Sequence, residues 1–226
     1  MTNNNVLVIV AHPDDETIGM GGTIKKHFDW GDNVFVVSMT DGIGARGKNK
    51  KISIQERKSN SIEASKILGF KWFEQFQFTD NQLDRYSIIE IIKTIEIVKE
   101  KLQPKLVYTH SSSDLNIDHK ILSSATLTAF RPQPEEVCRE IRLFEVSSAT
   151  DYGYKNITGI FTPNLFVNIS ETWKFKLSAL QCYGAEIKKF PHTRSLKALE
   201  NLSKVRGSSV GLPMAEAFEV VRKIIN

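Results

Sequence analysis

The chain of 226 residues has little cysteine, no long apolar segment near its N-terminus and no basic leader there. Its two cysteines, Cys138 and Cys182, lie far apart, which favours reduced thiols in a reducing compartment over a disulfide framework. The apolar run at residues 6–11 is too short for the core of a signal peptide or for a membrane span. We therefore expect a cytoplasmic protein without a membrane span.

Dense charge of one sign is also scarce. The net charge is +4, and the basic residues are scattered except in the cluster at residues 46–51. We interpret this cluster as a solvated loop that could meet a small anionic ligand, and we expect no nucleic-acid partner. No internal repeat and no Pro/Gly/Ser-rich linker is present, and a chain of this length suits one core. We expect a single domain over residues 1–226.

Apolar runs alternate with helical patterns along the chain. In the first half we predict strands at residues 6–10, 33–39, 72–78 and 105–109, and helices at 17–30, 53–68 and 88–102. In the second half we predict a helix at 119–130, strands at 141–146 and 165–169, and two helices within 195–225. The order predicts an α/β fold with a Rossmann-like parallel sheet and helices on both faces. Ligands bind such sheets beyond the carboxyl ends of the strands.

Acidic residues and histidines follow three of the predicted strands. They are His12, Asp14 and Asp15 after the first strand, Asp41 after the second, and His110, Asp114, Asp118 and His119 after a later one. The spacing of His12 and Asp15 lets both side chains turn toward one point if Pro13 opens a helical turn. His119 would complete a set of two histidines and one carboxylate with an open position, which is typical of a catalytic zinc site. The simpler interpretation, that Asp14 and Asp15 only cap a helix, leaves the second group of residues unexplained.

Two of these segments, AHPDDE at residues 11–16 and DLNIDH at 114–119, resemble the PIG-L/LmbE-like N-deacetylase family. Residues 40–42, 46–47, 192–195, 206–207 and 215–218 also resemble family segments. The resemblance implies a Rossmann-like enzyme that removes acetyl groups from amino sugars or related glycoconjugates with Zn²⁺ or another divalent cation. It implies that His12, Asp15 and His119 bind the metal and that Asp14 is the general base.

The group that stabilises the oxyanion is left open by the sequence. Some family members carry a histidine three positions before the ligand histidine, where this chain has Asn116. An amide can donate a hydrogen bond to developing charge, but it cannot deliver a proton. His192 or His110 could take this part instead. Asp118 could orient a ligand histidine, cap a helix, or do both.

For substrate binding we expect Asp41, Arg46, Asp114 and Arg194. Because a guanidinium suits phosphate or carboxylate, Arg46 leads to the hypothesis that the substrate carries an anionic group near its acetamide. The expected partner is a small N-acetylated sugar or glycoconjugate, and family members are often homo-oligomers. One alternative is a metal-dependent hydrolase of another small amide, such as a thiol conjugate or an antibiotic intermediate. Another is a sugar- or nucleotide-binding relative without catalysis.

Glycines at positions 19, 21 and 22 hint at a dinucleotide-binding loop after the first strand. The sharp Gly-x-Gly-x-x-Gly turn is missing, and acidic residues stand where a pyrophosphate would bind. We expect these glycines to let a helix pack closely on the sheet instead.

Overall fold

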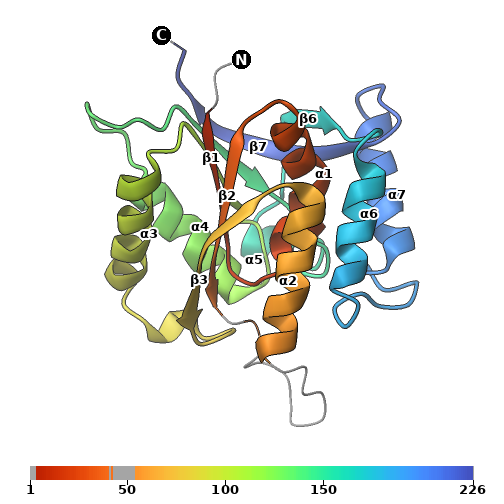
Figure 1. Ribbon diagram of the computed structural model, residues 1–226, viewed down its shortest axis with the longest axis horizontal. Helices are drawn as coiled ribbons and strands as arrows, with labels where there is room; N and C mark the ends of the chain where they lie inside the picture. Colours follow the sequence, from red (N-terminus) through yellow and green to blue (C-terminus); the bar gives the residue numbers. More distant parts are fainter. Residues whose placement is uncertain (1–3, 41, 43–53, 226) are drawn as a thin grey trace.

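A seven-stranded sheet forms the centre of the computed structural model, which describes residues 4–40, 42 and 54–225 (Figure 1). The strands of these ranges lie in the order β3-β2-β1-β4-β5-β7-β6. Their bounds are β1 Asn5–Val10, β2 Asn33–Thr40, β3 Lys71–Phe78, β4 Leu106–His110, β5 Glu140–Phe144, β6 Leu165–Asn168 and β7 Ala215–Lys223. The pairs from β3 to β5 are parallel, and β7 pairs antiparallel with both β5 and β6. The predicted Rossmann-like α/β fold is confirmed.

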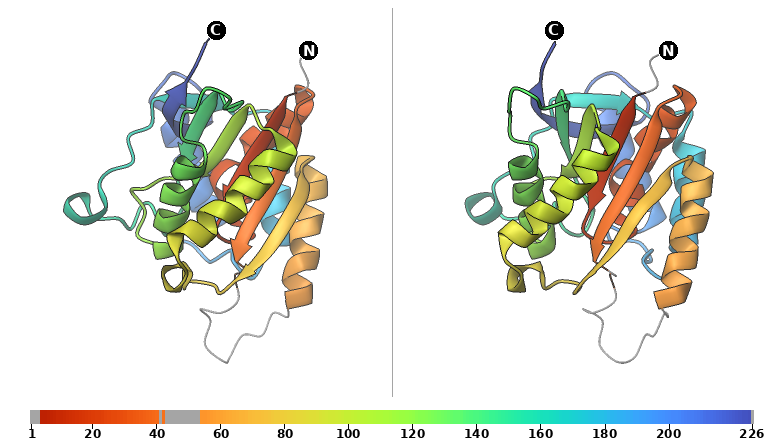
Figure 2. Two further views of the ribbon diagram at one scale, coloured as in Figure 1. Left: turned by 90° about the vertical axis from the view of Figure 1, so that its left-hand side faces the viewer. Right: turned by 60° about the vertical axis from the view of Figure 1, so that its left-hand side comes forward.

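Helices cover both faces of the sheet. Their bounds are α1 Asp15–Asp29, α2 Ile54–Leu68, α3 Ile88–Leu102, α4 Ile117–Ala129, α5 Lys155–Thr158, α6 Trp173–Cys182 and α7 Leu196–Ser208, with a 3-10 turn at Leu83–Arg85. Helices α3 and α4 lie on one face, and α1, α2, α6 and α7 on the other (Figures 1 and 2). None of the described helices is long and apolar enough to cross a membrane.

The apolar run in β1 is explained by burial on both sides of the sheet. Successive side chains of a strand point to opposite faces. Val6, Val8 and Val10 accordingly enter the core beneath α1, α2, α6 and α7, whereas Leu7 and Ile9 enter the core beneath α3 and α4. A strand buried on both faces has an almost unbroken apolar sequence, which is why it could be identified without alternation.

The last element differs from its sequence-based prediction. We predicted two helices between residues 195 and 225, but only α7 forms, and residues 215–223 are the strand β7. Its first four residues are buried between β5 and β6, and its later part carries Val220 and Val221. Branched side chains favour strands, and pairing with two neighbours satisfies the backbone. These partners are distant in sequence, so local periodicity could not reveal them.

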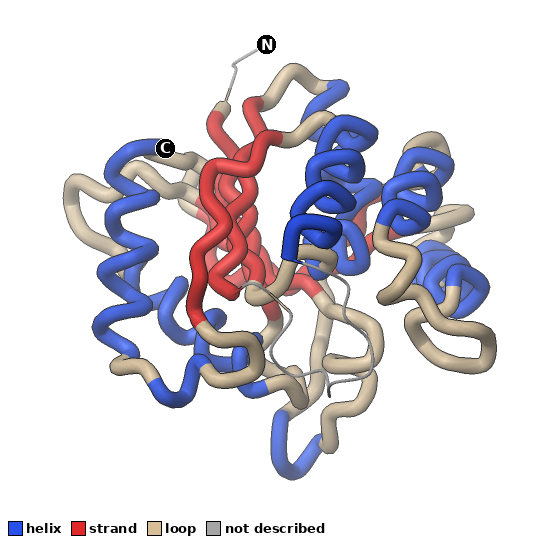
Figure 3. The backbone as a smooth tube through the Cα atoms, turned by 60° about the horizontal axis from the view of Figure 1, so that its bottom comes forward, coloured by secondary structure: helices blue, strands red, loops and turns tan. Residues whose placement is uncertain are grey.

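Strand order places the candidate site between β1 and β4. The chain winds from β1 through β2 to β3 on one side, and then crosses to β4 on the other side of β1. This reversal leaves a crevice beyond the carboxyl ends of β1 and β4, the usual ligand position in such sheets. Figure 3 views that end of the molecule, where the connecting loops gather.

Close packing of α1 on the end of β6 depends on Gly22. A Cβ atom at Gly22 would lie 2.7 and 2.8 Å from side-chain atoms of Ile169, the residue that follows β6. At the adjacent Gly21 the nearest atom is Cγ of Lys176, at 3.2 Å, so that side chain would need to yield only slightly. Gly19 meets the Phe144 ring of β5 closely as well, and the expected role of these glycines in packing a helix on the sheet is confirmed.

We predict that Gly22→Ala lowers the free energy of unfolding by about 1–3 kcal/mol, because the new methyl group overpacks a rigid contact. The control, Gly21→Ala, should change it by less than about 1 kcal/mol, because the neighbouring side chain needs to shift only slightly. Urea denaturation measures both. Equal losses would contradict the packing argument.

Candidate metal and catalytic site

A tight turn after β1 brings His12 and Asp15 together. The backbone N–H of Asp15 donates to the carbonyl of His12 over 3.3 Å, and the backbone N–H of His12 donates to Asp15 Oδ2 over 2.9 Å. Asp14, between them, has φ +155° and ψ −26°, a conformation that is costly for a residue with a side chain. Its carboxylate makes no helix-capping bond, so the simple capping interpretation fails for Asp14.

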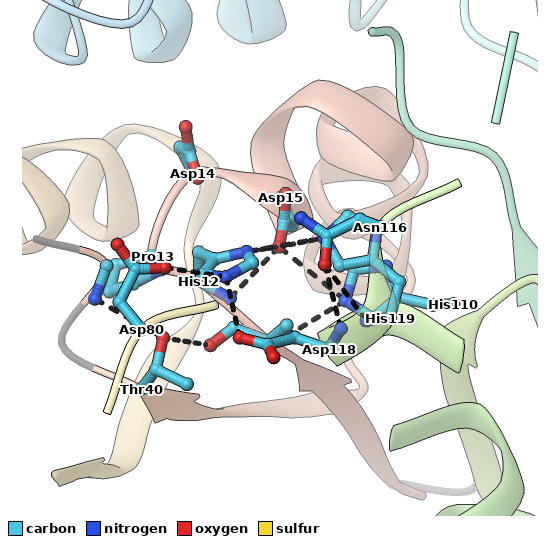
Figure 4. A network of polar contacts seen from close by, with 12 residues as sticks. His12, Pro13, Asp14, Asp15, Thr40, Asp80, His110, Asn116, Asp118 and His119 are labelled. Atoms are coloured by element: carbon cyan, nitrogen blue, oxygen red, sulfur yellow. Dashed lines mark hydrogen bonds and ion pairs between the residues drawn. The ribbon is translucent and has the colours of Figure 1, made fainter. Parts of the chain in front are cut away.

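Helix α4 brings a third side chain to this turn (Figure 4). His119 lies in the first turn of α4, and Asn116 caps the helix by accepting hydrogen bonds from two backbone N–H groups. Of the two roles left open for Asp118, helix capping is thus excluded, because Asn116 holds that position. His119 Nε2 lies 3.3 Å from both His12 Nδ1 and Asp15 Oδ2, and the latter two atoms are 3.1 Å apart.

These distances suit one tetrahedral metal ion. Bonds of about 2.0–2.1 Å at tetrahedral angles separate neighbouring ligand atoms by about 3.3–3.4 Å. Asp15 Oδ1 is buried without a hydrogen-bond partner among the described residues. The three residues are at most 8% exposed. His12, Asp15 and His119 thus form a group that fits a divalent metal, with an open side.

In both candidate ligand histidines, the outer ring nitrogen, which points away from the metal group, faces a carboxylate. His119 Nδ1 lies 2.9 Å from Asp114 Oδ2, and His12 Nε2 lies 3.1 Å from Asp80 Oδ1 and 3.3 Å from Asp118 Oδ2. A carboxylate acceptor places the proton of a neutral imidazole on the outer nitrogen and leaves the inner lone pair for a metal. Sequence reasoning missed Asp80, although it follows β3 at the same edge of the parallel sheet.

The electrostatic environment of the group favours positive charge. Burial opposes charge on His119, but the Asp15 and Asp114 carboxylates outweigh it and raise its pKa to about 9. Burial likewise opposes charge on His12, and Asp15 with neighbouring carboxylates raises its pKa well above the usual value. Although burial disfavours the Asp15 carboxylate, the two histidines hold its pKa well below the usual range. A bound cation would take the place of the imidazole protons.

Asp14 is held by two arginines instead of by the histidines. Arg57 Nη2 lies 3.4 Å from Asp14 Oδ1, and Arg194 Nη1 lies 3.2 Å from Oδ2. Arg57 also pairs with Glu186 at 2.8 Å, and all four side chains are largely buried. Burial raises the pKa of Asp14, and the two guanidinium groups only partly offset this. No pattern in the sequence pointed to Arg57 or Glu186, because they come from α2 and from the segment between α6 and α7.

Asn116 is the only one of the three oxyanion candidates that lines the cleft in front of the metal group. This cleft has a volume of about 150 Å³, and its described lining residues are His12, Asp14, Gly42, Arg57, Asp80, Asn81, Asn116 and Arg194. His110 is fully buried, stacked on the His119 ring at 3.8 Å, and its Nε2 accepts from the backbone N–H of Ala11. His192 Nδ1 accepts from the backbone N–H of Arg194.

The four residues expected to bind substrate differ in where the structure places them. Arg194 lines the cleft. Asp114 is fully buried and bonded to His119 and Thr150, which leaves it no access to a substrate. Its position behind His119, a candidate ligand, explains the discrepancy and suits it to orienting that ring. Asp41 and Arg46 lie outside the described residues.

Fold and site together define an α/β protein with a candidate mononuclear metal centre at the switch point of its sheet. The family model described as PIG-L, GlcNAc-PI de-N-acetylase, matches residues 7–130, more than half of the chain. The protein belongs to the PIG-L family.

Three comparisons show the range of its relatives. A probable N-acetyl-alpha-D-glucosaminyl L-malate deacetylase 2 from Bacillus cereus is 26% identical over 190 residues, covering 80% of this chain and 83% of its own. The solved structure of N,N'-diacetylchitobiose deacetylase from Pyrococcus horikoshii has a TM-score of 0.77 at 25% identity, covering 97% and 84% of the two chains. A 4-oxalmesaconate hydratase from Pseudomonas putida is 23% identical over 218 residues, covering 80% and 74%.

We predict that Asp114→Ala weakens zinc binding by about 10- to 100-fold, because His119 loses the carboxylate that orients it. Competition with a chromophoric chelator measures the affinity. Asp84→Ala removes an exposed carboxylate outside the site and should leave the affinity unchanged. Equal affinity in all three proteins would show that Asp114 does not support the metal.

Proposed function

We propose that the protein is a metal-dependent N-deacetylase that hydrolyses the acetamido group of an amino sugar or related glycoconjugate to acetate and a free amine. One observation carries the proposal: a three-ligand metal group opens into a polar cleft beside a carboxylate, Asp14, that is not part of that group. The names of two relatives support N-acetylated sugars as substrates.

In this proposal His12, Asp15 and His119 hold the metal, with Zn²⁺ favoured because two imidazole nitrogens and one carboxylate oxygen are a common zinc donor set. A divalent metal held there supplies Lewis acidity and lowers the pKa of water bound to it.

Asp14 moves the proton. Its carboxylate accepts the proton of the attacking water and passes it to the nitrogen of the departing amine. Arg57 and Arg194 hold both carboxylate oxygens in place, so that the base stays at the edge of the cleft. The arginines also favour the ionised carboxylate and so offset part of the cost of burial.

The cleft suits a hydroxyl-rich ligand. Asp80, Asn81 and Arg194 offer acceptors and donors there, and none of the described lining residues has a hydrocarbon side chain. We assign Arg194 to substrate binding, and Asp41 and Arg46 remain predicted contacts. A single domain and a cytoplasmic location belong to the same proposal.

We predict that the purified protein releases acetate from one or more of a panel of N-acetylated amino sugars. Chelator should abolish the release, and added Zn²⁺ should restore it, because the metal group is required. Elemental analysis of untreated protein should find about one metal ion per chain. Full activity in metal-free protein would refute the proposal. Addition of water to a double bond without any acetate release would indicate a hydratase instead.

We predict that Asp14→Asn reduces kcat by about 10²- to 10⁴-fold and leaves metal content near that of the wild type, because the change removes proton transfer and no ligand. Asp15→Asn should lose metal and activity together. Metal analysis and acetate assays on the same samples separate the two roles. Loss of metal in the Asp14 variant would make Asp14 a ligand.

A further inference from the structure

We infer that Asn116 is a catalytic residue whose side-chain amide donates a hydrogen bond to the oxygen that becomes negative when the acetamide carbonyl is attacked. The inference rests on the proposed function and adds a residue to it. Its basis is the combination of a side-chain amide fixed by the start of α4 and the cleft into which that amide opens.

The helix fixes which end of the amide faces the cleft. Asn116 Oδ1 accepts hydrogen bonds from the backbone N–H groups of Asp118 at 2.8 Å and His119 at 3.4 Å. Only the oxygen of an amide can accept from such donors, so the assignment of O and N follows from the hydrogen bonds. The NH₂ group must lie on the opposite arm, away from the helix. The hydrogen bonds to Oδ1 therefore fix the direction of the NH₂ group, and no further contact is needed to hold it.

That direction leads into the metal cleft. Asn116 lines the cleft together with His12 and Asp14. Figure 4 shows the amide nitrogen turned toward His12 and Asp15, and the oxygen turned toward the first turn of α4. No described residue accepts a hydrogen bond from Asn116 Nδ2. An oriented donor without an acceptor, beside the metal group, is a candidate for stabilising charge that appears only during the reaction.

Other donors near the cleft are less suitable. His110 is buried behind His119, and the Arg194 guanidinium is bound to Asp14 and to Ser148. Asn81 also lines the cleft, but its side chain is exposed, and only its backbone N–H is bonded to the site, through Asp118.

The role requires no proton transfer. A carboxamide stays neutral and keeps both its hydrogens, so it can stabilise the oxyanion only by hydrogen bonding. Protonation of the leaving amine therefore remains with Asp14.

Asn116→Ser and Asn116→Asp separate this role from helix capping. Serine and aspartate are both good N-caps, and neither extends an NH₂ group into the cleft. We expect kcat to fall by about 10²- to 10³-fold in both variants, as for the loss of one oxyanion donor, with KM changed only a few-fold. Metal content and Tm of the serine variant should match the wild type. Asn201→Ser, the same change at an exposed position of α7 outside the cleft, should leave kcat within about threefold.

A second measurement does not depend on turnover. A methylphosphonamide analogue of the acetamide resembles the tetrahedral intermediate, so its affinity should fall in Asn116→Ser roughly in parallel with kcat. Affinity for the unreactive amine product should stay unchanged.

Two results would overturn the inference while the proposed function stands. Wild-type kcat and analogue affinity in Asn116→Ser would show that Asn116 is only a cap. Metal loss that accounts for the lower activity would show that it acts through His119. A wild-type protein that releases no acetate from any substrate would refute the proposed function, and this inference with it.

Discussion

The contact between Asp15 and two histidines is the interaction on which the site depends. A buried carboxylate is costly unless it is paired, and here His12 and His119 meet one of its oxygens from two different strand ends. The negative charge of Asp15 can be balanced by protons on the histidines or by a metal ion, because both supply positive charge at the same point. Metal binding displaces those protons, which couples metal affinity to pH. The carboxylates of Asp80, Asp114 and Asp118 can accept hydrogen bonds from the histidine rings whether the histidines carry extra protons or bind a metal.

The geometry of that contact relies on elements far from it. Helix α1 is interrupted at Met20, and its second part begins where Gly22 and Thr23 donate backbone hydrogen bonds to Glu216 of β7. Lys176 of α6 pairs with the same carboxylate at 2.6 Å. The short first part, which starts at Asp15, leads directly into this anchored second part. A packing arrangement between α1, α6 and β7 therefore contributes to where Asp15 lies.

The sequence predicted the parts of the site that follow from local order and failed for those that need long-range contacts. Residues after β1 and β4 could be placed together because the carboxyl ends of parallel strands share one edge. Arg57 and Glu186 could not be found this way, since their side chains reach Asp14 from helices and loops whose direction depends on packing. The same limit explains β7, whose strand partners are remote. Asp118 was the cap that the sequence suggested, and only the backbone geometry shows that Asn116 caps α4 instead.

The charge balance of the cleft gives a physical reason for a neutral donor at position 116. Two guanidinium groups already lie beside Asp14, and a metal would add two further positive charges near them. An imidazolium at position 116 would be repelled by these charges and would lose its proton more readily. A carboxamide provides a hydrogen bond without further charge, and its orientation is fixed by the helix it caps. The chain can thus combine structural support of α4 with a donor at the cleft in a single side chain.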